Sequence, residues 1–202
     1  MAASRLGRLD RVAVGVGSFA LSGFFPVAPA TFASALAAGA LWLVYPLGSW
    51  VAYAAVVAIV LGVGVWACGR MERLYGHDPS AAVIDEVCGM AITLAGAPID
   101  IATLLFGFLF FRFFDVVKVA PGRRIERLPG GWGVMMDDVV AGLYAFAALR
   151  LLLWAWPEPR LHVAHVVALG AAAIVLAVFR KPLMRRYGKP RTRIGAIGNR
   201  EA

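Results

Sequence analysis

Between Arg11 and Arg70, 58 consecutive positions carry no Asp, Glu, Lys, Arg or His. One membrane-spanning helix needs roughly 20 apolar residues, so this run is long enough for at least two spans. The whole chain of 202 residues is 61% hydrophobic and only 16% charged, with a mean hydropathy of +0.76. This composition excludes an ordinary water-soluble domain and predicts an integral membrane protein.

Proline, glycine and charged residues divide the apolar sequence into about six predicted membrane segments. These segments cover residues 32–47, 50–69, 82–97, 99–117, 133–156 and 161–180. The third begins with Asp85 and Glu86 and has a short apolar part, so a re-entrant helix is an alternative for it. The sequence therefore predicts an all-α, polytopic helical bundle that forms one transmembrane domain over residues 1–202.

The basic residues are unevenly placed along the chain, which carries a formal net charge of +8. Eight of the 20 Lys and Arg residues lie between Arg180 and Arg200, after the last apolar segment. Six crossings put these residues on the same side as most of the other basic loops, and the positive-inside rule makes that side the cytoplasm. We therefore predict two cytoplasmic termini and a basic tail, 180–202, that contacts anionic lipid rather than nucleic acid.

Five carboxylates lie within or beside the predicted membrane segments, where a charged side chain is costly to bury. They are Asp85, Glu86, Asp115, Asp137 and Asp138. The six-span topology puts all of them at the cytoplasmic ends of their helices, so we expect them to converge in one pocket. A divalent cation would offset their mutual repulsion, and carboxylates without clustered His or Cys favour Mg²⁺ over zinc.

Helix capping is an alternative explanation for these carboxylates. Four of them open their predicted helices, where acidic residues stabilise the first turn without any further role. Asp115 does not fit this explanation, because it stands near the C-terminal end of an apolar segment. Capping therefore explains single residues better than it explains the set.

Two basic residues flank Asp115 at helical spacing. Arg112 lies three positions before it and Lys118 three positions after it, so the three side chains are expected on one helix face. The two basic residues either pair with Asp115 for structural reasons or bind the oxygens of a phosphate group. The spacing alone leaves both interpretations open.

A second candidate anion site precedes the first predicted segment. Residues 25–34 are rich in small side chains, and Thr31 and Ser34 stand where a helix is expected to begin. Backbone N–H groups and hydroxyls at a helix N-terminus can bind a phosphate. The alternative is that Thr31 is an ordinary N-cap residue.

Three sequence blocks occur in an order and spacing that are typical of one protein family. They are residues 23–34 (GFFPVAPATFAS), 77–89 (HDPSAAVIDEVCG) and 112–142 (RFFDVVKVAPGRRIERLPGGWGVMMDDVVAG), and together they span about 120 residues. The last block combines RFFDxxK with GGxGxMxDDxxAG and is the most specific. On these blocks the chain resembles the phosphatidylglycerophosphatase A family of bacterial membrane phosphatases.

The resemblance implies a phosphoric monoester hydrolase of the bacterial inner membrane that converts phosphatidylglycerophosphate to phosphatidylglycerol and inorganic phosphate, with Mg²⁺ as cofactor. The catalytic residues that it implies are Asp85, Glu86, Asp115, Lys118, Asp137 and Asp138. The five acids among them would also bind the metal. The substrate would be bound by Thr31, Ser34, Arg112 and Lys118. Ala30 and Ala33 replace glycines expected in the first block of the family.

An enzyme of this kind is expected to use a metal-activated water, with Lys118 and Arg112 stabilising the charge on the phosphoryl oxygens, at a site that faces the cytoplasm. A variant makes Asp115 the nucleophile of a phospho-aspartyl intermediate. Two hypotheses of other classes remain: a membrane cation transporter or channel that uses the intramembrane acids, and a non-catalytic scaffold. Acids gathered at one edge of the membrane favour the enzyme.

Overall fold

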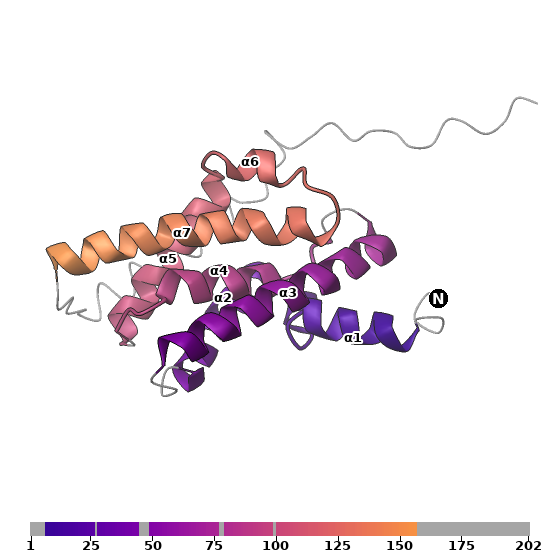
Figure 1. Cartoon of the computed structure of the whole chain (residues 1–202), viewed down its shortest axis with the longest axis horizontal. Helices are drawn as coiled ribbons and strands as arrows, with labels where there is room; N and C mark the ends of the chain where they lie inside the picture. The colour runs from indigo at the N-terminus through magenta and orange to yellow at the C-terminus, as the bar shows by residue number, and fades with distance from the viewer. Residues whose placement is uncertain (1–6, 27, 45–48, 77–78, 99, 157–202) are drawn as a thin grey trace, which may run out of the picture.

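The computed structural model describes residues 7–26, 28–44, 49–76, 79–98 and 100–156. All regular elements within these ranges are helical, as predicted (Figure 1). In chain order they are α1 (Arg8–Gly17), the short 3-10 helix η2 (Ser22–Phe24), α2 (Pro29–Val44), α3 (Trp50–Tyr75), α4 (Ile84–Leu94), α5 (Ile101–Val117), α6 (Gly122–Ile125) and α7 (Gly131–Ala155). The predicted sixth segment, 161–180, and the basic tail, 180–202, lie outside the described residues.

The prediction of about six membrane segments is wrong for the part of the chain that the structure describes. Among those residues, only α3 and α7 are long and apolar enough to cross a membrane. At 1.5 Å per residue, the 11 residues of α4 extend about 16 Å, roughly half of a 30 Å hydrocarbon core. α2 and α5 have 16 and 17 residues. The breaks lie where the sequence predicts them, but α4 buries most of its residues against other helices rather than spanning a bilayer.

α3 continues to Tyr75, whereas the predicted segment ends at residue 69. The extra turns are stabilised by α1. Met71 is fully buried there, and a Cβ added to Gly17 of α1 would lie 2.4 Å from its sulfur. The charge of Arg70 is paired with that of Asp10 in α1, with 2.6 Å between Nη1 and Oδ1. Charged residues thus remain helical because a neighbouring helix supplies their partners.

α4 is the central helix of the bundle, since it packs against α2, α3, α5 and α7 (Figure 1). Eight of its 11 residues are buried. Met90 packs in one apolar core with Phe111 of α5 and Leu149 of α7, and all three side chains are fully buried. Thr93 is buried in the same helix and donates its hydroxyl proton to the Gly89 carbonyl, 2.8 Å away. The helix that carries Asp85 and Glu86 is therefore packed against its neighbours on several sides.

Glycines fix the level at which α4 meets α7. A Cβ added to Gly89 would lie 2.9 Å from the Asp138 carbonyl oxygen, and one added to Gly142 would lie 2.7 Å from the Gly89 carbonyl oxygen. Gly142 follows Asp138 by four residues, and Gly89 follows Asp85 by four residues. Because the two glycines meet, α4 and α7 run parallel and their acidic residues lie at a similar height along the helices. α5 runs in the opposite direction, with Phe111 against Gly89, and its C-terminal end meets the same level.

Candidate active site

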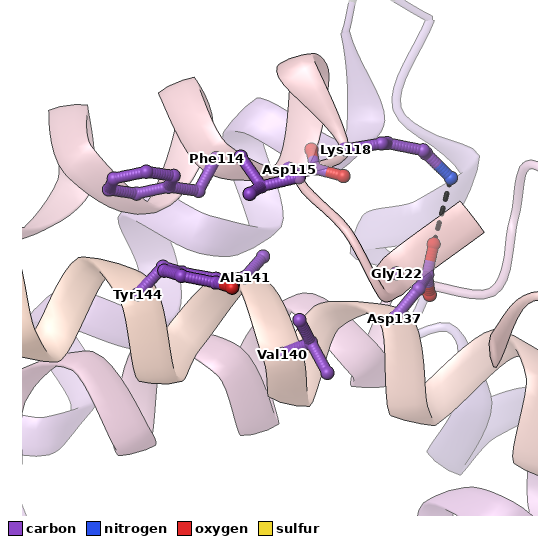
Figure 2. A pocket seen from close by; sticks show the side chains of 9 residues that line it. Phe114, Asp115, Lys118, Gly122, Asp137, Val140, Ala141 and Tyr144 are labelled. Carbon is purple, nitrogen blue, oxygen red and sulfur yellow. Dashed lines mark hydrogen bonds and ion pairs between the residues drawn. The ribbon is translucent and has the colours of Figure 1, made fainter. Parts of the chain in front are cut away.

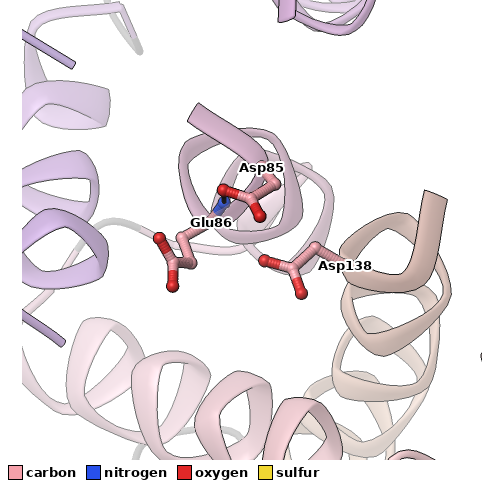
Figure 3. Close-up of side chains that lie close together, drawn as sticks. All are labelled: Asp85, Glu86 and Asp138. Atoms are coloured by element: carbon pink, nitrogen blue, oxygen red, sulfur yellow. Dashed lines mark hydrogen bonds between the residues drawn. The ribbon is translucent and has the colours of Figure 1, made fainter. Parts of the chain in front are cut away.

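Asp85, Glu86 and Asp138 form an acidic cluster between α4 and α7 (Figure 3). One carboxylate oxygen of each residue lies within 4.8 Å of the corresponding oxygens of the other two. Glu86 and Asp138 are only 3% and 4% exposed, and Asp85 is half-buried.

The capping explanation holds in part for α4 and is wrong for α7. Asp85 and Glu86 do lie in the first turn of α4, where the Asp85 Oδ1 atom accepts the Glu86 backbone N–H at 3.1 Å. α7 begins at Gly131, and its first turn contains no acidic residue. Asp137 and Asp138 lie in its second turn, too far along the helix to serve its N-terminus. Helix capping therefore does not explain the positions of Asp137 and Asp138.

An arginine with two carboxylate partners connects α5 to the acidic cluster. The Arg112 Nη1 atom lies 3.0 Å from Asp115 Oδ2 and 3.6 Å from Glu86 Oε1. Arg112 and Asp115 are each 3% exposed, so these charges interact in a setting with little solvent screening. The pairing of Arg112 with Asp115, which the sequence left open, is thus present, and it extends to Glu86.

Lys118 leaves the helical face on which the sequence analysis expected it. α5 ends at Val117, and Lys118 adopts a left-handed backbone conformation with φ 49°. Its Nζ atom lies 2.8 Å from Asp137 Oδ2 and 2.5 Å from Glu126 Oε1. The lysine therefore joins the end of α5 to α7 and to the loop between them, instead of continuing the Arg112–Asp115 row.

The charge state of Lys118 follows from these contacts. Burial alone would lower the pKa of its ammonium group, but the negative charges of Asp137 and Glu126 and their hydrogen bonds raise the pKa above its ordinary value. Lys118 is therefore positively charged throughout the physiological pH range. It supplies a permanent cation a short distance from the acidic cluster.

A small pocket lies between the end of α5 and the first half of α7 (Figure 2). This lysine pocket is lined by Phe114, Asp115, Lys118, Val119, Gly122, Asp137, Val140, Ala141 and Tyr144. Figure 2 shows Lys118 and Asp137 at one end of this pocket and the rings of Phe114 and Tyr144 at the other. The rings of Phe114 and Tyr144 stack with centroids 5.5 Å apart, and the Tyr144 hydroxyl donates to the Ala120 carbonyl at 2.8 Å.

The five predicted carboxylates do converge. The Asp138 carboxylate lies within electrostatic range of the other four acids. Asp115 and Asp137 line the lysine pocket, whereas Asp85, Glu86 and Asp138 form the acidic cluster. Residues up to 53 positions apart therefore meet at one end of three helices, and they divide into two adjoining regions.

Thr31 and Ser34 lie in the first two turns of α2, at the start of a helix as predicted. α2 begins at Pro29, so Thr31 lies inside its first turn and is not the N-cap residue. Ser34 is fully buried and donates its hydroxyl proton to the Ala30 carbonyl, 2.9 Å away. Neither residue lines the lysine pocket or belongs to the acidic cluster. The described geometry gives no support to a phosphate site at residues 25–34.

Glu126 is the charged residue of the site that was not predicted from the sequence. It stands in the arginine-rich loop and follows Lys118 by eight positions, so no helical spacing connects the two. The available signal was an isolated acid in a basic loop, four residues before the Gly130–Gly131 pair. Its contact with Lys118 depends on how the loop folds back.

The donor set of the acidic cluster suits a hard cation. It consists of carboxylate oxygens from Asp85, Glu86 and Asp138, which are ligands preferred by Mg²⁺ and Ca²⁺. Asp137 is paired with Lys118, and Asp115 lies closer to Arg112 than Glu86 does, at 3.0 Å against 3.6 Å. The geometry therefore favours three of the five predicted metal ligands over the other two.

The placement of buried charge bears on the transporter hypothesis. Among the described residues, the buried charged side chains are Glu86, Arg112, Asp115 and Asp138. All of them lie at the same end of α4, α5 and α7. A cation pathway needs polar positions through the thickness of the membrane, so this distribution gives the transporter hypothesis no support.

The phosphatidylglycerophosphatase A family profile matches residues 15–153 of the chain. This match includes the acidic cluster, the lysine pocket and Glu126. No solved structure matches the chain.

Three bacterial proteins are similar to the chain. A protein of Bacteroides thetaiotaomicron, provisionally named a phosphatidylinositol-3-phosphatase, is 40% identical over 141 residues, which are 66% of this chain and 88% of the relative. The phosphatidylglycerophosphatase A of Escherichia coli K12 is 37% identical over 149 residues, or 72% of this chain and 84% of the relative. The phosphatidylglycerophosphatase A of Haemophilus influenzae is 38% identical over 91 residues, which are 44% of this chain and 56% of the relative.

Proposed function

Because the chain belongs to the phosphatidylglycerophosphatase A family and is a phosphatase, we propose that it removes the terminal phosphate of phosphatidylglycerophosphate. The products are phosphatidylglycerol and inorganic phosphate. The observation that carries this proposal is the meeting of the acidic cluster with a permanently charged lysine at the edge of a small, half-apolar pocket. A phosphomonoester on a lipid combines the same features, an anionic group and an apolar body.

Mg²⁺ is the proposed cofactor, and Asp85, Glu86 and Asp138 are its proposed ligands. One carboxylate oxygen from each residue lies within 4.8 Å of the other two, so the three residues could share one cation. When bound, the cation would neutralise the cluster, polarise a phosphoryl oxygen and lower the pKa of an attacking water.

The residues of the lysine pocket act on the substrate phosphate in this proposal. Lys118 has three N–H donors, of which Asp137 and Glu126 each accept one, so one remains for a phosphoryl oxygen. The ammonium group would bind the negatively charged phosphoryl oxygens of the substrate. Phe114 and Tyr144 line the apolar end of the pocket, which is the side from which the lipid part of the substrate would approach.

Arg112 and Asp115 have a supporting role in this proposal. Their burial and their ion pair suit residues that hold Glu86 in place more than residues that bind a mobile headgroup. An aspartate engaged by an arginine is also a poorer nucleophile. Direct attack by water is therefore favoured over a phospho-aspartyl intermediate at Asp115.

We infer that the site lies just inside the cytoplasmic face of the bacterial inner membrane. Trp132 and Trp154 are exposed near the two ends of α7 and are separated by about 33 Å along the helix, a distance that suits two interfaces. Asp138 follows Trp132 by six residues, about 9 Å deeper. The exposed Arg124 and Arg127 would attract anionic lipid to the entrance.

A phosphate-release assay on purified protein in mixed micelles tests the proposal. The substrates are phosphatidylglycerophosphate, phosphatidylinositol 3-phosphate and phosphatidic acid, each with Mg²⁺ and with a chelator. We expect release from phosphatidylglycerophosphate only with Mg²⁺. Preferential release from phosphatidylinositol 3-phosphate would replace the proposed substrate, and undiminished release in chelator would exclude the metal mechanism.

A further inference from the structure

The Lys118 ammonium is held by carboxylates from two separate elements. Asp137 belongs to α7 and lies 2.8 Å from Nζ, while Glu126 belongs to the loop that follows α6 and lies 2.5 Å from Nζ. The Lys118 and Asp137 side chains are 13% and 12% exposed, whereas that of Glu126 is 35% exposed. Glu126 therefore covers the lysine from the solvent side.

The backbone brings Glu126 to this position in two steps. The single turn of α6 ends with the Glu126 N–H donating to the Gly122 carbonyl, 3.0 Å away. The loop then folds against α7 at Gly133, where an added Cβ would lie 2.8 Å from the Glu126 carbonyl oxygen. Gly133 is one helical turn before Asp137, so the loop and Asp137 reach Lys118 from the same face of α7.

This arrangement restricts a flexible side chain. A lysine has four rotatable carbon bonds, and an ammonium held by one carboxylate can still move around that contact. Two carboxylates on separate elements define its position much more closely. The third N–H can then meet a phosphate oxygen without a further loss of side-chain entropy on binding.

We propose that Glu126 is a positioning residue for substrate phosphate: together with Asp137 it holds the Lys118 ammonium at the polar end of the lysine pocket. This inference rests on the proposed function and adds a residue outside α4, α5 and α7 to it. Glu126 acts through Lys118 and does not itself contact the phosphate. Its effect should therefore appear mainly in substrate binding.

Steady-state kinetics on phosphatidylglycerophosphate with Mg²⁺ give the first test. Glu126→Ala should raise KM about tenfold and change kcat by less than about threefold, because the catalytic carboxylates remain in place. Glu126→Asp keeps the charge and should restore most of the loss, and Glu126→Gln should fall between the two. An unchanged KM in Glu126→Ala, or an equal loss in Glu126→Asp, would overturn the proposal.

Asp10→Asn is the matched control. Asp10 also pairs with a basic residue, Arg70, at 2.6 Å and with 27% of its side chain exposed, but it lies on α1 outside the site. This variant should leave kcat and KM unchanged. A rise of KM equal to that of Glu126→Ala would indicate a general effect of breaking an ion pair and would refute the specific role of Glu126.

A second measurement does not depend on turnover. Brief acetylation with acetic anhydride, read by peptide mass spectrometry, reports how readily the Lys118 amine is modified. Glu126→Ala should raise the labelling rate of Lys118 about threefold or more, and Asp10→Asn should not. Wild-type protein that releases no phosphate from any of the lipids would refute the proposed function, while unchanged labelling in Glu126→Ala would refute the positioning role alone.

Discussion

Asp137 and Asp138 are adjacent in the sequence, yet they belong to different regions of the molecule. Asp138 is buried in the acidic cluster with Asp85 and Glu86. Asp137 lines the lysine pocket and is paired with Lys118. One region gathers negative charge, whereas the other carries its own cation.

The difference shows how a doublet of identical residues can serve two roles. Successive side chains of an α-helix point about 100° apart, so Asp137 faces the end of α5 while Asp138 faces α4. The parallel packing of α4 and α7 at Gly89 and Gly142 then places Asp138 beside Asp85 and Glu86. Neighbouring positions are thus separated by the helix, and distant ones are joined by packing.

The largest expected effect divides the two aspartates. Asp138→Asn should lower kcat/KM with Mg²⁺ by about a thousandfold or more, because it removes one of three proposed metal ligands. Asp137→Asn should cost about ten- to a hundredfold, since Lys118 keeps Glu126 as a partner. Equal losses in the two variants would contradict the division into an acidic cluster and a lysine pocket.

Thermal unfolding in detergent separates the same regions without an activity assay. Mg²⁺ should raise the Tm of the wild type, because a ligand that binds only the folded state stabilises it. The increase should vanish in Asp138→Asn and persist in Lys118→Met. Without Mg²⁺, Asp138→Asn should be more stable than the wild type, because it removes one charge from a group of repelling carboxylates. A Tm of the wild type that does not respond to Mg²⁺ would count against the metal site.

A substitution at the contact between α4 and α7 should disturb the acidic cluster indirectly, through the packing of the two helices. Gly89→Ala places a Cβ 2.3 Å from the Phe111 ring and 2.9 Å from the Asp138 carbonyl, and we expect a loss of about 1–3 kcal/mol in the free energy of unfolding. Gly62→Ala in α3 is the control, because nothing lies within 4 Å of its added Cβ. The control should gain about 0.5–1 kcal/mol from the better helix propensity of alanine.

The smallest effect is expected for an ion pair outside both regions. Asp10→Asn breaks the partly exposed contact between α1 and α3 and should cost less than about 1 kcal/mol in the free energy of unfolding. Phosphatase activity should not change. A large loss of activity would show that α1 contributes to the site in a way that the described contacts do not explain.

Much of the helical pattern was predictable from the sequence, because its breaks are local. Proline, glycine and charged residues separate the helices, and the observed bounds of α2, α5 and α7 lie within three residues of the predicted ones. The number of crossings was not predictable in the same way. An apolar stretch is equally compatible with lipid and with the interior of a bundle, and α4 takes the second environment.

The candidate site also has a part that was predictable from the sequence and a part that was not. The five acids and Lys118 could be named from residue type and spacing, because charge in apolar sequence is conspicuous. Their partners could not be named. Lys118 turns away at the end of α5, and Glu126 reaches it only because the loop folds against Gly133.

The sequence by itself determined the kind of protein and the candidate groups for its chemistry: an apolar helical chain of the phosphatidylglycerophosphatase A family with a small set of acids and bases. Only the tertiary structure decided which acid faces another acid and which faces a lysine. The physical reason is that composition and periodicity are properties of one segment, whereas pairing depends on the distance and rotation between segments. Those are fixed by packing, here at glycines that let α4, α7 and the α6–α7 loop come close together.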